Sequence, residues 1–270
     1  MAQITDLQSA VAAHIHDGQS IALEGFTHLI PMAVGHEIIR QKKKDLTLIR
    51  MTPDIIYDQM IGMGCAKKMI FSWGGNPGVG SLHQFRRAIQ LGLLDIEEYS
   101  HGAMANSYAA GASGMPVAFL KGYQGTSYPA VNPNIRFVDC PFTGEQLVAV
   151  PAINPDVGVI HAQKADRQGN IWIDGIVGVQ KEVLLASKCS IVTVEEIVPQ
   201  VSEKQGGMVI PSWVIDSVCV VPHGAYPSYA SGYSVRDNNF YKQWDVISRD
   251  PTKFAHWMAI NVLSTQEAVS

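Results

Sequence analysis

The sequence predicts an α/β protein whose centre is an open, mostly parallel sheet with helices on both faces. Short apolar strands alternate with helical segments over the first third of the chain, an order that is typical of a parallel sheet. Two glycine-containing loops, Gly25 to Pro31 and Gly74 to Ser81, each follow one of these strands. Ligands of parallel sheets bind beyond the carboxyl ends of the strands, so we expect both loops at one edge of the sheet.

Caps and periodicity place the amino-terminal elements. The capping box Thr5-Asp6-Leu7-Gln8 opens a helix that Gly18 is placed to end. Pro31 suits the first turn of a second helix, which runs to the lysines at 42–44. We expect Ser81 to cap another helix, which has apolar residues on one face. The other elements expected here are strands at 20–23, 46–51 and 68–72 and a helix at 55–61.

The rest of the chain divides into a middle segment and a carboxyl-terminal part. Small residues, Gly and Pro dominate residues 102–143, which predicts ordered loops around a site or an interface. Beyond them we expect strands at 156–161, 171–173 and 190–194, a helix at 179–187, and two amphipathic helices within 240–263. We find no internal repeat and no dividing linker, so residues 1–270 are expected to form a single domain.

Composition narrows the class of protein. The chain has 270 residues, of which 47% are hydrophobic and only 16% are charged, enough for a sizeable core and a surface partly covered by a second polypeptide. A formal charge of −4 without a basic run argues against nucleic acid or membrane as the main partner. The first residues carry no signal-peptide pattern, and no apolar run is long enough to span a membrane. We therefore expect a cytoplasmic protein.

The loop from Gly74 to Ser81 carries the most information. Glycines let main-chain N–H groups approach a ligand closely, and a following helix adds the positive end of its dipole. The spacing fits neither the dinucleotide fingerprint nor the Walker loop. The loop is therefore either an anion site of another kind or a turn needed for tight strand-to-helix packing. The residues expected to bind an oxyanion, or the anionic ligand that carries it, are Gly74, Gly75, Asn76, Gly78 and Gly80.

Several side chains are candidates for chemistry. Glu24 ends a strand before Gly25, where it would act as a nucleophile or base, or instead accept hydrogen bonds that hold the loop. His28 and His101 would either bind a substrate carboxylate or have structural roles. Of the pair Glu195-Glu196, we expect one acid to be buried by hydrogen bonds and the other solvated.

Other kinds of site find little support. The four cysteines are scattered and lack metal-ligand spacing, so we expect reduced thiols and no metal. Cys140 precedes Pro141 in a loop, but nothing nearby marks it as a nucleophile. No G-x-S-x-G elbow or Ser-His-Asp set is present. The sequence thus offers a binding edge without an obvious nucleophile.

Four segments resemble family I coenzyme A transferases, in their α subunits. The segment Glu24-Gly25-Phe26-Thr27-His28-Leu29-Ile30-Pro31 resembles the Gly-Phe signature of that family, and residues 72–81 are similar to its matching loop. The resemblance continues through residues 161–170 and 191–198 and covers nearly the whole chain. Within the family, the likeness is to the longer α subunits of the glutaconate CoA-transferase-like branch.

The resemblance implies a NagB/RpiA-like fold and an α2β2 assembly with a β subunit. It also implies ping-pong chemistry, in which a glutamate of the β subunit forms first an acyl anhydride and then a glutamyl-CoA thioester. This chain lacks the Ser-Glu-Asn-Gly-type motif that carries the glutamate, so no residue here is a certain catalytic group; Glu24 and His101 would have supporting roles. Coenzyme A thioesters would be substrates, with the glycine-loop residues named above binding coenzyme A and the thioester carbonyl, and there would be no tightly bound cofactor.

The substrate follows from the same resemblance. The segment Gly25-Phe26-Thr27-His28 would contact it, and the expected reaction moves coenzyme A from succinyl-CoA to 3-oxoadipate. Three alternatives stay open: a glutaconate-type transferase, a hydrolase of a cyclic acyl-CoA from steroid-ring breakdown, and a regulatory protein that binds CoA thioesters without catalysis. Such hydrolases carry an acid in the segment that corresponds to Ser100-His101-Gly102. His101 occupies that place here, which weakens the hydrolase alternative.

Overall fold

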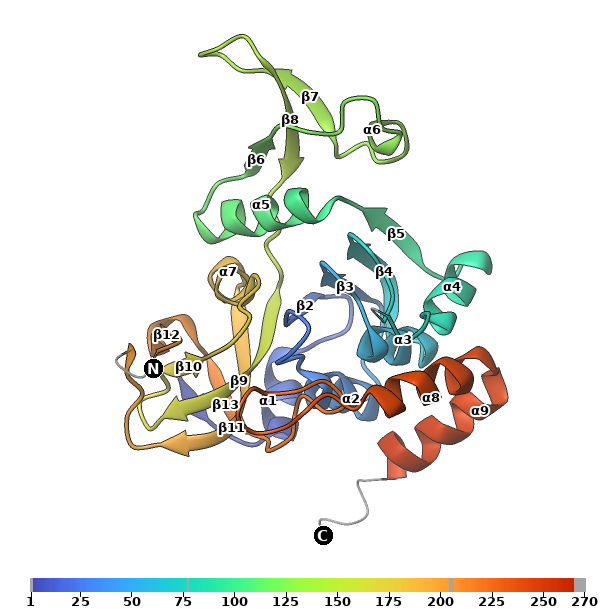
Figure 1. Ribbon diagram of the computed structural model, residues 1–270, viewed down its shortest axis with the longest axis vertical. Helices are drawn as coiled ribbons and strands as arrows, with labels where there is room; N and C mark the ends of the chain where they lie inside the picture. Colours follow the sequence, from blue (N-terminus) through green and yellow to red (C-terminus); the bar gives the residue numbers. More distant parts are fainter. Residues whose placement is uncertain (1, 77, 204–205, 265–270) are drawn as a thin grey trace.

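The computed structural model describes residues 2–76, 78–203 and 206–264, and a twisted, mostly parallel sheet forms its centre (Figure 1). Neighbouring strands along the main path are all parallel. In spatial order they are β1 (Gln3–Ile4), β13 (Ser217–Val220), β11 (Cys189–Val198), β9 (Val157–Asp166), β2 (Ser20–Glu24), β3 (Leu46–Arg50), β4 (Ala66–Phe71) and β5 (Asp95–Glu98). Two short strands, β10 (Ile171–Ile173) and β12 (Met208–Ile210), add an antiparallel extension to β9.

Helices cover both faces of this sheet. Ile21 and Leu23 of β2 join one hydrophobic cluster, whereas Ala22 between them joins another, because successive strand residues point to opposite faces. The first cluster lies between the sheet and six helices: α1 (Leu7–His14), α2 (Met32–Arg40), α3 (Ile55–Gly62), α4 (His83–Gln90), α8 (Asn238–Arg249) and α9 (Pro251–Met258). Helix α9 continues into a π-helical turn (Ala259–Leu263). On the opposite face lie α5 (His101–Ala112) and α7 (Gln180–Ala186), and a 3-10 turn (Ser212–Val214) precedes β13. The predicted fold class is confirmed.

The middle segment differs from its prediction. Residues 102–143 are not loops alone, because α5 begins at His101, and an antiparallel sheet follows, with the order β6 (Val117–Leu120), β8 (Gln146–Pro151) and β7 (Arg136–Asp139). Gly111 lies inside α5, where an added Cβ would come within 2.3 Å of the Ile153 carbonyl oxygen. Gly111 therefore permits close packing of α5 against the chain at Ile153 and does not mark a turn.

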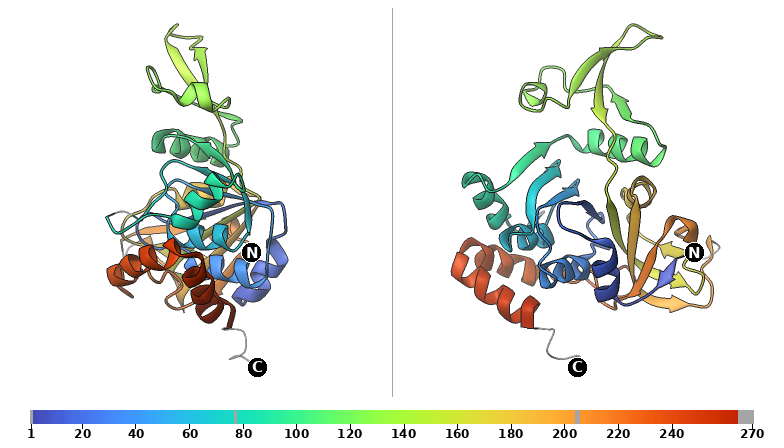
Figure 2. Two further views of the ribbon diagram at one scale, coloured as in Figure 1. Left: turned by 90° about the vertical axis from the view of Figure 1, so that its right-hand side faces the viewer. Right: turned by 180° about the vertical axis from the view of Figure 1, so that it is seen from behind.

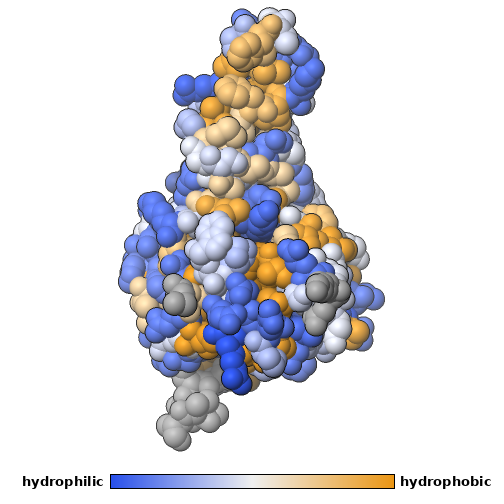
Figure 3. All heavy atoms as spheres, turned by 90° about the vertical axis from the view of Figure 1, so that its left-hand side faces the viewer, coloured by the Kyte–Doolittle hydropathy of each residue, from blue (hydrophilic) through white to orange (hydrophobic). Residues whose placement is uncertain are grey.

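This small sheet and α6 (Tyr128–Val131) form an arm that projects from the rest of the molecule (Figure 2). Apolar side chains gather on its surface (Figure 3), and several are exposed, among them Phe119, Val131, Phe137 and Phe142. An exposed apolar surface of this kind is typical of a protein contact.

Two helix starts also differ from expectation. The N-cap of α1 is Asp6, whose carboxylate accepts the N–H of Ser9 at 2.8 Å, and not Thr5. The prediction that Ser81 caps α4 is wrong, because the helix begins at His83 after an N-cap at Leu82. The Ser81 N–H donates instead to Asp245 of α8, so a tertiary contact fixes this residue. In the described part of the chain, no helix is both long and apolar enough to cross a bilayer.

Candidate active site

A cavity of about 230 Å³ lies at the carboxyl ends of β2, β3 and β4, next to the start of α5. Phe26 and Thr27 of the loop after β2 line one side, and Trp73, the residue before the glycine loop, lines the other. Because β2, β3 and β4 are parallel, the two loops lie at one edge of the sheet, as predicted. Its walls are made by Glu24, Gly25, Phe26, Thr27, Ile30, Arg50, Met51, Thr52, Asp54, Trp73, His101, Arg236 and Tyr241.

Glu24 is the last residue of β2, and only 3% of it is exposed. Its Oε1 accepts the N–H of Met51 at 3.0 Å and the hydroxyl of Tyr108 at 3.1 Å. Burial raises the pKa of Glu24 to about 7, against the opposing charge of Arg50 and these hydrogen bonds. The carboxyl group therefore holds the cavity wall together, and it gains or loses its charge near neutral pH.

Arg50 ends β3 beside Glu24 and is also buried. It donates to the carbonyl oxygen of Gly25 at 3.0 Å and lies 3.5 Å from a carboxylate oxygen of Asp54. Its guanidinium carbon lies 5.5 Å from the ring centroid of Tyr57, a cation–π distance. Arg50 thus fixes the loop after β2 and supplies positive charge at the strand ends.

The loop after β2 has a strained backbone. Thr27 and Leu29 have φ of 62° and 52°, values that non-glycine residues seldom adopt. At Gly25 an added Cβ would come within 2.5 Å of the Leu29 carbonyl oxygen. The Ser228 hydroxyl donates to the Thr27 carbonyl at 3.0 Å, and the Leu29 N–H donates to Tyr229 at 2.8 Å. These contacts maintain a conformation that costs free energy and presents Phe26 and Thr27 to the cavity.

The two candidate histidines have different surroundings. His101, the first residue of α5, lines the cavity and bridges two loops, with Nε2 at 2.8 Å from the Thr52 hydroxyl and Nδ1 at 2.6 Å from the Ser72 hydroxyl. His28 is fully buried and is not part of the lining; its Nε2 lies 2.6 Å from the Ile176 carbonyl oxygen. Only His101 is placed to meet a small ligand in this cavity.

The glycine loop beyond Trp73 does not line the cavity. Two of its amides donate to main-chain carbonyls, from Gly75 to Pro53 at 3.2 Å and from Asn76 to Gly80 at 3.1 Å. Gly78 and Gly80 have φ of 74° and 146°, which favour glycine. The contacts among described residues are those of tight packing, and an oxyanion role stays a prediction.

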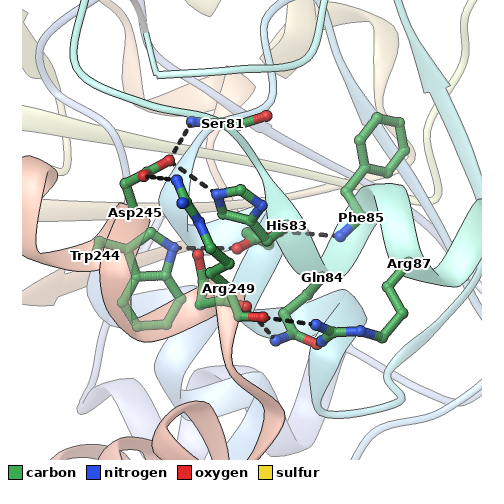
Figure 4. Close-up of polar contacts among 10 residues, drawn as sticks. Ser81, His83, Gln84, Phe85, Arg87, Trp244, Asp245 and Arg249 are labelled. Carbon is green, nitrogen blue, oxygen red and sulfur yellow. Dashed lines mark hydrogen bonds and ion pairs between the residues drawn. The ribbon is translucent and has the colours of Figure 1, made fainter.

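Helix α8 fastens this loop to the body of the protein (Figure 4). Asp245 accepts the Ser81 N–H at 3.0 Å, lies 2.9 Å from His83 Nε2, and accepts from Arg249 at 2.7 Å. An added Cβ at Gly80 would come within 2.8 Å of the Asp245 side chain. The close approach of α8 therefore accounts for one glycine of the loop.

A second buried acid connects the same helices. Asp58 of α3 accepts the Phe85 N–H at 2.9 Å and the Trp244 indole N–H at 3.1 Å. Burial raises the pKa of Asp58 to about 7 despite these hydrogen bonds. Helices α3, α4 and α8 are therefore joined by buried hydrogen bonds next to the glycine loop.

Glu195 and Glu196 behave as expected. Glu195 is buried between the His161 ring, at 3.1 Å, and the His223 N–H, at 2.6 Å. Glu196 is exposed and lies 3.7 Å from the ammonium group of Lys164. Neither acid lines the cavity.

The remaining candidates lie elsewhere. All four cysteines are free thiols, and Cys140 belongs to the arm, outside the cavity lining. Among the described residues, no group of three or more His, Cys, Asp or Glu is arranged to hold a metal ion.

Sequence reasoning missed most of the charged lining. Arg50 and Asp54 flank the end of a predicted strand, so a charged residue closing an apolar strand was an available signal for Arg50. Tyr108 was hidden in a segment taken for loops. Arg236 and Tyr241 come from far along the chain, and no local pattern marks them.

A parallel sheet with a charged cavity at its strand ends is the arrangement in which α/β proteins bind small ligands. A family model described as Coenzyme A transferase matches residues 4–220, and the chain belongs to that family.

Individual relatives agree with this. The chain is 57% identical to the A-type subunit of 3-oxoadipate CoA-transferase from Pseudomonas knackmussii, over 99% of this chain and 96% of that one. It is 32% identical to the A-type subunit of glutaconate CoA-transferase from Acidaminococcus fermentans, over 94% and 86% of the two chains. The crystal structure of glutaconate coenzyme A-transferase from the same organism superposes with a TM-score of 0.91 at 31% identity, covering 97% of this chain and 89% of that one.

Proposed function

We propose that this chain is the α subunit of an enzyme that moves coenzyme A from succinyl-CoA to 3-oxoadipate. The observation that carries the proposal is the 57% identity, over nearly the full length of both chains, to a protein named as part of a 3-oxoadipate CoA-transferase. The chain would form one domain and act in the cytoplasm with a β subunit. It would use coenzyme A thioesters as substrates and hold no tightly bound cofactor.

The proposed chemistry assigns the nucleophile to the partner. A glutamate of the β subunit would attack the succinyl-CoA carbonyl to give an anhydride and free thiolate, and the thiolate would then attack the glutamyl carbonyl and release succinate. The carboxylate of the acceptor would repeat these steps in reverse and leave with coenzyme A. Glu24 supports this assignment, because it is 3% exposed and engaged by two hydrogen bonds, a poor situation for a nucleophile.

In this scheme the chain positions substrates. Gly25, Phe26 and Thr27 would contact the acyl group, and His101 would hold the neighbouring loops in place. His28 would support the loop after β2 without contacting the substrate, since its ring is buried against Ile176 and Tyr229. Donation to an oxyanion by Gly75 or Asn76 would require exchange of their present main-chain hydrogen bonds.

The test is an acceptor panel with the co-expressed α and β subunits. Succinyl-CoA is supplied with 3-oxoadipate, with glutaconate, or with water alone, and the acyl-CoA products are measured. The proposal predicts 3-oxoadipyl-CoA only when 3-oxoadipate and both polypeptides are present. Transfer to glutaconate but not to 3-oxoadipate would contradict the substrate assignment, and thioester loss in water alone would support the hydrolase alternative.

A further inference from the structure

The cavity contains more positive charge than its own acids balance. Arg50 and Arg236 supply two cations. Asp54 lies 3.5 Å from Arg50 and is the partner of that charge. Glu24 carries a carboxyl group that burial keeps partly protonated near neutral pH. The ionisable groups of the lining therefore leave a surplus of positive charge, which favours an anionic ligand.

Arg236 and Arg50 share one acid of the lining. Asp54 forms its ion pair with Arg50 at 3.5 Å, and the charge of Arg236 also acts on that carboxylate, without an ion pair of its own among the described residues. Within the described residues, no hydrogen bond or ion pair of the Arg236 guanidinium group is found, and its buried Nε lacks a partner. The Arg50 Nε is likewise buried without a partner in the described part of the chain. Both arginines line the cavity, so each has a buried N–H donor that an acceptor entering the cavity could satisfy.

Arg236 is also held in a geometry that suits a carboxylate. It precedes α8, and its guanidinium carbon lies 4.1 Å from the ring centroid of Tyr241. Contact with an aromatic face restrains the planar group and leaves its N–H edge available for a two-point contact. Tyr241 and Arg236 both line the cavity, whose other walls include the apolar Phe26, Ile30 and Met51.

We propose that Arg236 binds the free carboxylate of a dicarboxylic acyl substrate, the one that does not exchange coenzyme A. The methylene groups of the substrate would lie against the apolar wall, and the Tyr241 ring would keep the guanidinium oriented toward the carboxylate. Arg236 is then a specificity-determining residue that separates dicarboxylic from monocarboxylic acids. This inference rests on the proposed function, because it takes the substrates to be dicarboxylic.

The test compares two acceptors that differ only at the far end of the chain. The complex of α and β subunits is assayed with 3-oxoadipate and with 3-oxohexanoate, which has a methyl group in place of the second carboxylate. In ping-pong kinetics the kcat/KM of an acceptor reports its own half-reaction, so effects on the donor do not interfere. Arg236→Gln is expected to lower kcat/KM for 3-oxoadipate on the order of 10- to 100-fold and to leave 3-oxohexanoate nearly unchanged.

Two further variants make the result interpretable. Arg236→Lys keeps the charge but loses the paired N–H donors of the planar guanidinium. We therefore expect an intermediate decrease in kcat/KM, with 3-oxoadipate only. Arg86→Gln removes an exposed arginine of α4 that is absent from the cavity lining, and should behave as wild type.

The outcomes separate the inference from the function on which it rests. Equal losses for both acceptors in Arg236→Gln and Arg236→Lys would assign the arginine a structural role and overturn the inference. Unchanged kinetics with 3-oxoadipate would overturn it as well. A wild-type complex that does not use 3-oxoadipate would contradict the proposed function before any variant is compared.

Discussion

Replacing Glu24 by glutamine should remove a pH-dependent loss of stability. Burial raises the pKa of Glu24 from 4.5 to about 7 in the folded protein, so between these values the folded chain holds a proton that the unfolded chain releases. The free energy of unfolding therefore falls as the pH rises through this window and levels off above it. One pKa unit corresponds to about 1.4 kcal/mol, which gives a total loss of about 3 kcal/mol.

Glutamine has nearly the shape of glutamate, keeps an acceptor for the Met51 N–H and the Tyr108 hydroxyl, and does not titrate. The other buried acids, Asp54 and Asp58, are present in both proteins, so their contributions cancel in the difference. From about pH 5 to about pH 8, the free energy of unfolding of Glu24→Gln should therefore rise relative to that of wild type by about 2.5 kcal/mol.

Urea unfolding of the purified chain at a series of pH values measures this difference. Glu145→Gln is the matched control, because Glu145 is an exposed residue of the arm paired with Lys121, and it should show the wild-type slope. A Glu24→Gln protein whose stability follows the same slope as wild type would refute the reasoning. A variant less stable at every pH would refute it too, since the carboxylate would then be needed in its charged form.

Three other changes test the surroundings of the cavity. Gly25→Ala should lower the free energy of unfolding by at least about 2 kcal/mol, because the added Cβ would come within 2.5 Å of a carbonyl oxygen. The control Gly102→Ala places its Cβ where no other atom lies within 4 Å, so it should cost nothing. Urea unfolding measures both. Asp245→Asn should lose about 1–2 kcal/mol at neutral pH by the same assay. Partial burial opposes the shift, but hydrogen bonds hold the pKa of Asp245 below its ordinary value of 3.8. The difference should therefore shrink as the pH falls below 3.8 and close once the pH is below the lowered pKa of the folded protein; a constant gap would contradict this. His101→Ala should lower kcat/KM of the complex while changing unfolding free energy by no more than about 1 kcal/mol, and a fully active variant would rule out the loop-bridging role.

The sequence was sufficient for the part of the fold whose signals are local. The strands ending at Glu24, Arg50 and Phe71 are short, apolar and bounded by Gly, Pro or charged residues, so their parallel arrangement and the shared edge of their loops were predictable. Helix α5 was missed because its many small residues were interpreted as loop formers, whereas one of them, Gly111, serves close packing against Ile153.

The site was harder to predict than the sheet. Glu24 was identified because it ends a predicted strand before a glycine, and His101 because small residues flank it and the family resemblance marks its segment. Arg236 and Tyr241 enter the cavity from the segment before α8 and from α8 itself, and only tertiary packing brings them there. The same packing decides that His28 lies behind the loop, although it is adjacent in sequence to Thr27, which lines the cavity.

The central claim is that this chain positions substrates while its partner carries the nucleophile. The most direct measurement incubates the co-expressed complex with succinyl-CoA, reduces it with borohydride, and determines the mass of each polypeptide and its peptides. The account predicts a reduced glutamyl adduct on the β subunit, whereas the chain described here stays unmodified. An adduct on Glu24, or rapid loss of thioester with no adduct on either chain, would contradict it.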